Sequence, residues 1–281
     1  MQSGEDSMKN GISLQQILSE CALDNRLAVL GLMNEVPVSV ADVRRALIKA
    51  GAEKSFATVK RYLDSLKKIG LVDEKAGRYR LTNLGFYISR SFQDIAQNIS
   101  AINTRVEPLN RVSISYLPKR FIHGLKLLNS ARFIKDPFSL ITELLMRIQQ
   151  AEECIDMLAD RPSYQFFELV GNKVLQGVQY RGICSTGYAE VRQKYAAQFV
   201  SSHGLSGARL RSFRENFRMK EHPEVLMHAI VVDGRIAGIN FPYRGGGSNL
   251  DSGFMSDEPE FVEWVEEIIN YFWDRGTFLE F

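Results

Sequence analysis

The chain has few cysteines and no long apolar run, and both absences exclude classes of protein. Its three cysteines, Cys21, Cys154 and Cys184, lie far apart in 281 residues, without CxxC spacing. They predict neither a disulfide framework nor a zinc cluster, and we expect reduced thiols, with Cys21 and Cys154 on helical apolar faces. No stretch approaches the roughly 20 apolar residues of a membrane span, and the start MQSGEDSMKN is unlike a signal peptide. The sequence therefore predicts a cytoplasmic protein without a membrane partner.

Patterns typical of enzymes and cofactor sites are missing as well. No Walker or dinucleotide-binding glycine pattern occurs. Histidine is scarce, and His123, His203, His222 and His228 show no metal-ligand spacing and no evident partner for Ser/His/Asp or Cys/His catalysis. We therefore expect no metal, no cofactor and no enzymatic activity.

Positive charge is concentrated in one segment of the chain. The net charge is only +2, yet residues 41–90 hold 12 Lys or Arg against 5 Asp or Glu, whereas residues 105–281 hold 21 against 22. A compact basic segment is typical of a module that binds a polyanion, because neutralising phosphates supplies sequence-independent affinity for DNA. The alternative is an ordinary solvated charged surface.

Apolar periodicity divides the basic segment and its N-terminal neighbours into helices and a hairpin. Residues 14–33 predict two helical stretches, separated at Asp24-Asn25 and ending before Pro37. A third helix is expected from Ser39, with Asp42 completing a capping box, to about Gly51. A fourth begins at Ser55 and has its apolar stripe at Val59, Leu63, Leu66 and Ile69. The following GLVDEKAGRYRLTNLG predicts two short strands around an Ala76-Gly77 turn.

This order resembles the winged helix-turn-helix of archaeal and bacterial regulators over about residues 13–90. The resemblance implies double-stranded DNA as a partner, with Ser55, Thr58 and Arg61 at base edges in the major groove. The residues expected at phosphates are Lys54, Lys60, Lys75, Arg78 and Arg80. The alternative is a winged helix that binds protein and exposes its charges to water.

The segment after the hairpin predicts a long helix with a heptad seam. Residues 86–103 contain no Pro or Gly, and the seam consists of Ile88, Phe92, Ile95, Ile99 and Ile102. We expect a homodimer that presents two recognition helices to a pseudo-palindromic site. Two heptads are short for a coiled coil, so packing onto the chain's own second domain is the alternative. The predicted domains are 1–85, a linker or dimerisation helix at 86–104, and 105–281.

Residues 105–281 read as an α/β domain, which makes the whole chain α+β. Helical runs are expected at 139–159 and 188–202, and an amphipathic helix from about 259 to Gly276 closes the chain. Asp233-Gly234 predicts a tight hairpin. The expected strands are Gln165–Val170, Val178–Cys184, Ala208–Phe213, Leu226–Val232 and Arg235–Phe241.

Scattered features of this half resemble an archaeal family of methanogenesis and filamentation regulators. The first is LPKRF at 117–121, which continues through LKLLNSARFI. The other two are the later segments QGVQYRGIC and EWVEEIINYFW. The resemblance implies an effector domain similar to that of TrmB-type regulators, with a degenerate phospholipase-D-like fold. A working phospholipase-D site needs a histidine nucleophile and a lysine two positions after it. Here Ile230 occupies the lysine position after His228, so hydrolysis by this route is not expected. The alternative function is a nucleic-acid-processing enzyme tethered by a winged helix.

A small effector is also predicted for this half. Arg209 and Arg211 would share one face of a strand, and with Arg181 and His228 they would bind an anionic or polar metabolite at strand ends. The alternative is that these arginines pair on the surface with Glu215, Glu221 and Glu224. The loop 243–248, YRGGGS, is either an anion-binding nest of backbone N–H groups or an ordinary mobile loop.

Overall fold

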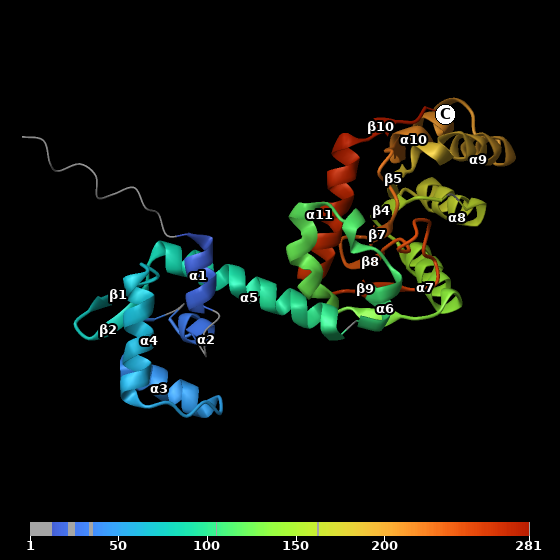
Figure 1. Cartoon of the computed structure of the whole chain (residues 1–281). Helices are drawn as coiled ribbons and strands as arrows, with labels where there is room; N and C mark the ends of the chain where they lie inside the picture. The colour runs from blue at the N-terminus through green and yellow to red at the C-terminus, as the bar shows by residue number, and fades with distance from the viewer. Residues whose placement is uncertain (1–12, 22–25, 34–35, 105, 162, 281) are drawn as a thin grey trace, which may run out of the picture. The chain divides into compact units, whose positions relative to one another are not determined.

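The computed structural model describes residues 13–21, 26–33, 36–104, 106–161 and 163–280 (Figure 1). Contacts within the chain separate two units, Met1–Gln97 and Asn98–Phe281. Among the described helices, none is both long and apolar enough to cross a bilayer. The three cysteines are free thiols. The predicted Asp24-Asn25 break lies outside the described residues.

The N-terminal unit consists of helices followed by a β-hairpin, as the sequence predicted. Helix α5 follows the hairpin and extends beyond the unit. The bounds are α1 Leu14–Cys21, α2 Arg26–Gly31, α3 Val40–Lys49, α4 Phe56–Lys68, β1 Val72–Lys75, β2 Arg78–Leu81 and α5 Asn83–Thr104. Strands β1 and β2 pair antiparallel, and Val38 forms a further bridge to Tyr79. This is the winged helix-turn-helix arrangement.

Local hydrogen bonds explain where the two central helices begin. The Ser39 side chain accepts the N–H of Asp42, while the Asp42 carboxylate accepts the N–H of Ser39, so the predicted capping box is confirmed. Ser55 Oγ likewise accepts the N–H of Thr58 at 3.2 Å. The apolar stripe of α4 then packs into a core shared with the other helices and the hairpin. Its fully buried members on α4 are Val59, Leu63 and Leu66.

The predicted heptad seam lies on α5, but its residues have different surroundings. Ile88 is buried in the core of the N-terminal unit, where Phe92 also packs. Ile102 packs against the core of the C-terminal unit. Ile95 and Ile99 are 46% and 53% exposed. The middle of the seam is therefore the part available for a partner.

The C-terminal unit has an eight-stranded mixed sheet of order β10-β6-β5-β4-β7-β8-β9-β3. The parallel pairs are β4 with β5 and β5 with β6, and the others are antiparallel. The strands are β3 Arg132–Ile134, β4 Cys154–Ala159, β5 Gln179–Cys184, β6 Phe217–Glu221, β7 His228–Val232, β8 Ile236–Asn240, β9 Gly253–Ser256 and β10 Thr277–Phe278.

Helices cover both faces of this sheet (Figure 1). One face packs against α7 Pro137–Gln150, α8 Tyr164–Leu175, α9 Ala189–Ser202 and α10 Gly207–Asn216. The other packs against α11 Pro259–Arg275 and the 3-10 segment η2 Lys119–Asn129. The remaining elements are α6 Val106–Arg111, η1 Ile114–Tyr116 and η3 Thr186–Tyr188. The α+β class predicted from the sequence is confirmed.

Several predicted elements in this unit are wrong. Residues 165–170 and 208–213, expected as strands, lie in α8 and α10. The helix expected over 139–159 ends at Gln150, and Cys154–Ala159 forms the central strand β4, so Cys154 is not on a helix. Segments of about six residues are too short for periodicity to distinguish a strand from part of a helix, and tertiary packing decides between them.

The hairpin predicted at Asp233-Gly234 is confirmed between β7 and β8. Both turn residues have positive φ, 53° and 61°, which a type I′ turn requires. The Asp233 carboxylate also accepts the N–H groups of Glu152, Glu153 and Cys154 at 2.8–2.9 Å. Asp233 therefore anchors the start of β4 as well as forming the turn.

Candidate functional site

Helix α4 presents one polar face to solvent opposite its buried stripe. Arg61 lies in the middle of this face, exposed and without an acidic partner among the described residues. Thr58 lies about one turn before it and Ser55 nearly two turns before it, and their hydroxyl oxygens are 3.0 Å apart. A free guanidinium beside two hydroxyls at the N-terminal half of a helix suits hydrogen bonding to base edges.

Lys60 differs from the expectation that it is free for phosphate. Its ammonium is 3.0 Å from Asp64 and 3.6 Å from Glu74, and it donates to the hydroxyl of Tyr79. The hydrogen bonds to Tyr79 and then Asp64 raise the pKa of Lys60 well above its ordinary value. Lys67 also pairs with Glu74, at 2.9 Å. Lys60 and Lys67 therefore brace α4 against the hairpin.

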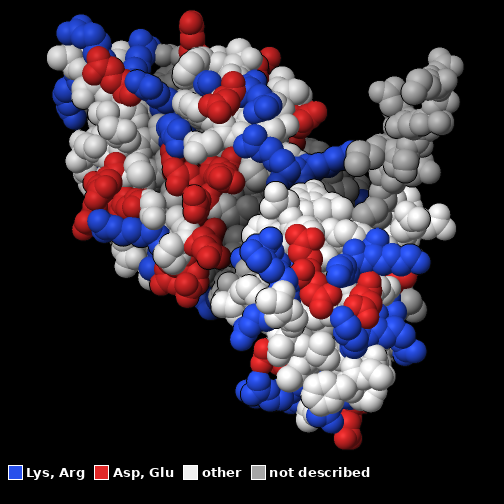
Figure 2. Space-filling model, turned by 90° about the vertical axis from the view of Figure 1, so that its left-hand side faces the viewer, with Lys and Arg blue, Asp and Glu red and all other residues white. Residues whose placement is uncertain are grey.

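The hairpin carries the remaining predicted phosphate contacts. Lys75 is exposed at its tip, and Arg80 is exposed 4.0 Å from Asp73. Arg78 is exposed and donates to the carbonyl of Pro37 at 3.2 Å. Figure 2 shows Lys and Arg side chains on this side of the N-terminal unit with Asp and Glu among them. The surface is basic but partly neutralised.

Sequence reasoning missed an arginine of α3 that packs against the start of α4. Arg44 on α3 lies 4.9 Å above the ring of Phe56, which is 52% exposed. Arg44 Nε also donates to the carbonyl of Lys54, another predicted phosphate contact, at 3.0 Å. The spacing of Arg44 and Phe56 along the chain carries no signal of this contact, because it depends on how α3 packs against the start of α4.

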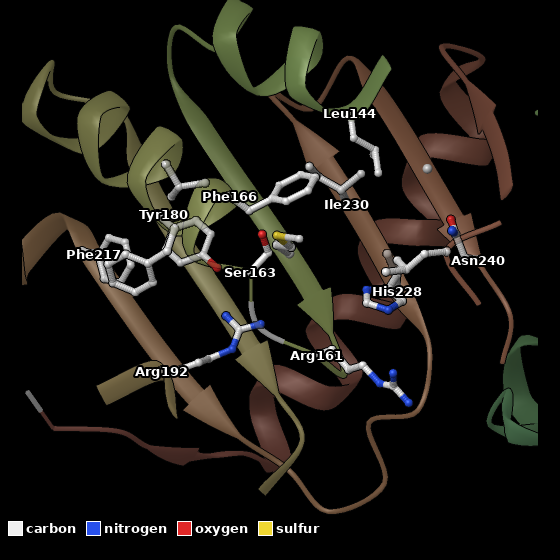
Figure 3. Close-up of a pocket in the computed structure, with 16 residues that line it drawn as sticks. Leu144, Arg161, Ser163, Phe166, Tyr180, Arg192, Phe217, His228, Ile230 and Asn240 are labelled. Atoms are coloured by element: carbon white, nitrogen blue, oxygen red, sulfur yellow. The ribbon is translucent and has the colours of Figure 1, made fainter. Parts of the chain in front are cut away.

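The C-terminal unit holds a cavity of about 110 Å³ on the sheet face covered by α7 and α8 (Figure 3). Most of its lining is apolar, and its polar residues come from several elements. The apolar lining is Leu144, Met157, Phe166, Phe167, Val170, Phe217, Ala229, Ile230, Gly238 and Leu250. The polar lining is Arg161, Ser163, Tyr180, Arg192, His228 and Asn240. An apolar cleft with few convergent polar groups is the usual form of a small-molecule site.

A hydrogen-bonded cluster stands beside this cavity. His228 Nε2 lies 2.6 Å from Asp160 Oδ1 and 2.5 Å from Ser248 Oγ, and Ser248 donates to the same carboxylate oxygen at 2.8 Å. A serine-hydrolase triad needs the serine and the carboxylate on opposite ring nitrogens. Here both contact Nε2, so the arrangement fixes the 243–248 loop instead of activating Ser248.

Of the four predicted effector residues, His228 alone lines the cavity. Arg181 donates from Nε to Asp156 Oδ1 at 2.7 Å and lies over the Trp273 ring of α11, on the opposite sheet face. Arg209 and Arg211 are exposed on α10, so their predicted common strand face is wrong. Neither forms an ion pair with Glu215, Glu221 or Glu224 among the described residues.

Sequence reasoning missed two cavity arginines, Arg161 and Arg192. Arg192 is 6% exposed, and Ala196 and Phe199 share its buried face on α9. The spacing of four and then three residues was a signal, because it places the arginine in an apolar stripe. Tyr180 was missed as well. A side chain at Gly182 would collide with the Tyr180 hydroxyl, since its Cβ would lie 2.2 Å away, and this close approach requires glycine.

Comparison with known proteins gives matches in fold only. No protein-family model and no curated protein sequence matches the chain. TrmBL2, an archaeal chromatin protein described as showing a novel mode of DNA binding, has 11% identity and a TM-score of 0.40 over 94% of this chain and 99% of its own. Nuc from Salmonella typhimurium, a phospholipase D family member, has 14% identity and a TM-score of 0.34 over 49% and 89%. NucT from Helicobacter pylori has 8% identity and a TM-score of 0.36 over 53% of this chain and 98% of its own.

Proposed function

We propose that this protein is a DNA-binding transcriptional regulator whose C-terminal unit senses a small anionic molecule. The observation that carries the first part is the exposed face of α4, where Arg61 has no acidic partner among the described residues. Beside this face stands a basic hairpin. Arginine at such a position can bridge O6 and N7 of guanine, which no point charge can do.

The basic residues of the N-terminal unit divide into two roles in this proposal. Arg61, with Ser55 and Thr58, reads base edges. Lys54, Lys75, Arg78 and Arg80 contact phosphates, which position the protein without carrying sequence information. Lys60 instead supports the angle between α4 and the hairpin through Asp64, Glu74 and Tyr79.

The regulator acts as a homodimer through α5 in this proposal. Ile95 and Ile99 are exposed on one seam of that helix. Two copies of the chain burying these side chains against each other would present two recognition helices to a pseudo-palindromic site. Membership of the archaeal methanogenesis and filamentation regulator family, with a TrmB-like effector domain, is part of the same proposal.

The C-terminal unit is a sensor without catalytic activity in this proposal. His228 and Ile230 point to the same side of β7 and line the cavity, so an apolar side chain stands where phosphoryl chemistry needs a cation. The second candidate, a nucleic-acid-processing enzyme of phospholipase-D type, rests on His228 beside Asp160. With Ile230 in that position, an intermediate phosphate on His228 would lack the cation that a working site of this type provides two positions after the histidine.

One experiment separates the two candidates. The purified chain is incubated with labelled genomic DNA fragments, and the products are examined by footprinting and on a denaturing gel. Protected sites on intact DNA support the regulator, and the footprint also gives the site and its symmetry. Cleavage that is lost in His228→Ala supports the enzyme and contradicts the regulator.

A further inference from the structure

Arg192 is a buried cation whose charge is uncompensated. Its side chain contacts the carbonyl of Ala159 at 3.4 Å and the hydroxyl of Tyr180, and its Nε has no hydrogen-bond partner. Among the described residues it pairs with no carboxylate. Burying an unpaired guanidinium destabilises a protein unless an anion joins it. The site therefore lacks one negative charge.

The cavity next to Arg192 contains no acidic side chain that could supply that charge. None of its described lining residues is Asp or Glu, and exposed Arg161 adds a second cation. The nearby carboxylate of Asp160 is already engaged by His228 and Ser248. Figure 3 shows Tyr180 and Arg192 facing each other at one end of the cavity. This end is built for an anion.

The opposite end of the cavity is apolar, and the cavity as a whole is small. Leu144, Phe166 and Ile230 line it (Figure 3). The cavity volume of about 110 Å³ is close to the roughly 150 Å³ of an apolar protein cavity that takes up benzene. This size suits one ring or a short branched chain and is too small to enclose a nucleotide or a long acyl chain.

We infer that the cavity binds a small monocarboxylate, with its carboxylate on Arg192 and Tyr180 and its apolar body against Leu144, Phe166 and Ile230. This inference rests on the proposed sensing function and names its ligand class. The planar guanidinium matches a carboxylate in a two-point contact. Burial raises the pKa of Tyr180, so its hydroxyl stays protonated at neutral pH and donates to the anion. Phosphate fits less well, because it carries more negative charge than a carboxylate does, whereas the cavity offers one buried cation.

The direct test is binding of benzoate to the full chain, measured by calorimetry and by the shift in Tm. Benzamide has the same shape without charge, and inorganic phosphate has charge without the apolar body. We expect benzoate to bind at least tenfold more tightly than either compound. Equal affinity for benzoate and benzamide, or no binding of benzoate, would overturn the inference without any variant.

Two arginine variants locate the site. Arg192→Met removes the buried charge and keeps the aliphatic stem, whereas Arg211→Met makes the same change at an exposed position on α10. We expect Arg192→Met to weaken benzoate binding at least tenfold and to leave the ligand-free Tm unchanged or raised. Arg211→Met should retain full binding. The opposite pattern would place the site on α10 and overturn the inference.

Failure of the ligand class and failure of the regulator proposal have different signatures. DNA affinity is measured with and without benzoate for the unmodified chain and for Arg192→Met. Benzoate binding with no DNA affinity contradicts the regulator and leaves the cavity assignment intact. DNA binding without benzoate binding contradicts the cavity assignment alone.

Discussion

The Nε2 atom of His228 lies 2.6 Å from Oδ1 of Asp160, and both side chains are mostly buried. Ser248 completes the cluster by donating to the same oxygen. The cluster thus ties the end of β4 and the start of β7 to the 243–248 loop. Removing the carboxylate would leave two partly buried polar groups, those of His228 and Ser248, without their common partner.

We expect Asp160→Ala to lower the free energy of unfolding by about 1–3 kcal/mol, because the partly buried polar groups of His228 and Ser248 lose their acceptor. Urea denaturation measures the change. Asp274→Ala is the control, since Asp274 is exposed on α11 and should change stability little. Equal losses in the two variants would contradict a structural role for the cluster.

The same carboxylate predicts a pH dependence. Burial acts to raise the pKa of Asp160, but hydrogen bonds to His228 and Ser248 outweigh it, so the net pKa lies below 3.8. A carboxyl with a lowered folded-state pKa stabilises the protein above about pH 3.8 and loses that contribution as pH falls through the folded value. The difference in unfolding free energy between the unmodified chain and Asp160→Asn should therefore shrink below that pH. A constant difference would be inconsistent with the shift.

The capping box of α3 predicts a local change of pKa. Hydrogen bonds from the Ser39 side chain and then its backbone lower the pKa of Asp42 from 3.8 to about 2. The stabilisation is present above pH 3.8 and is lost as pH falls through about 2. In Ser39→Ala, NMR titration of the carboxyl carbon should show the pKa moving back towards 3.8. Ser55 caps another helix, α4, so Ser55→Ala should leave the pKa of Asp42 near 2.

The exposed seam of α5 predicts a dimer. In Ile95→Glu with Ile99→Glu, two charges replace side chains that would each contribute about 1.5–3 kcal/mol when fully buried. We expect light scattering to give a dimer mass for the unmodified chain and a monomer mass for this variant. Gln97→Glu with Asn103→Glu adds the same charge at other exposed positions of α5 and should remain dimeric. A monomer mass for the unmodified chain, unchanged with DNA, would contradict the dimer.

The N-terminal unit was largely predictable because its signals are local. Ser39 and Ser55 cap helices through contacts three residues away, and apolar spacing defines the faces of α3 and α4. The orientation of Lys60 was not predictable, since it depends on Glu74 and Tyr79 of the folded hairpin. Sequence spacing alone cannot show which exposed cation will form an ion pair with a nearby carboxylate.

The C-terminal unit was harder to predict because its apolar segments are short. Cys154–Ala159 is a central strand buried by helices on both faces, so its sequence lacks the alternation of a half-exposed strand. Arg181 and Arg192 illustrate the same limit for the site. Only the folded structure shows that Arg181 pairs with Asp156 on the sheet face covered by α11, while Arg192 of α9 reaches the cavity on the other face.

The face of α4 predicts unequal effects of two neighbouring cations. Arg61→Ala should cost about 1–3 kcal/mol at a specific operator and flatten preference at one base pair. Lys67→Ala should change affinity little or equally for all sequences, because Lys67 pairs with Glu74. Fluorescence anisotropy on the footprinted operator and its single-base variants measures both. Equal losses would place the reading face elsewhere.

The most direct measurement is the affinity of the unmodified chain for a labelled duplex across a salt series starting from dilute buffer. A protein that contacts phosphates releases counterions, so the logarithm of its affinity falls linearly with the logarithm of salt concentration. We predict binding at the lowest salt and a steep linear loss as salt rises. No affinity for any duplex in dilute buffer would contradict the regulator.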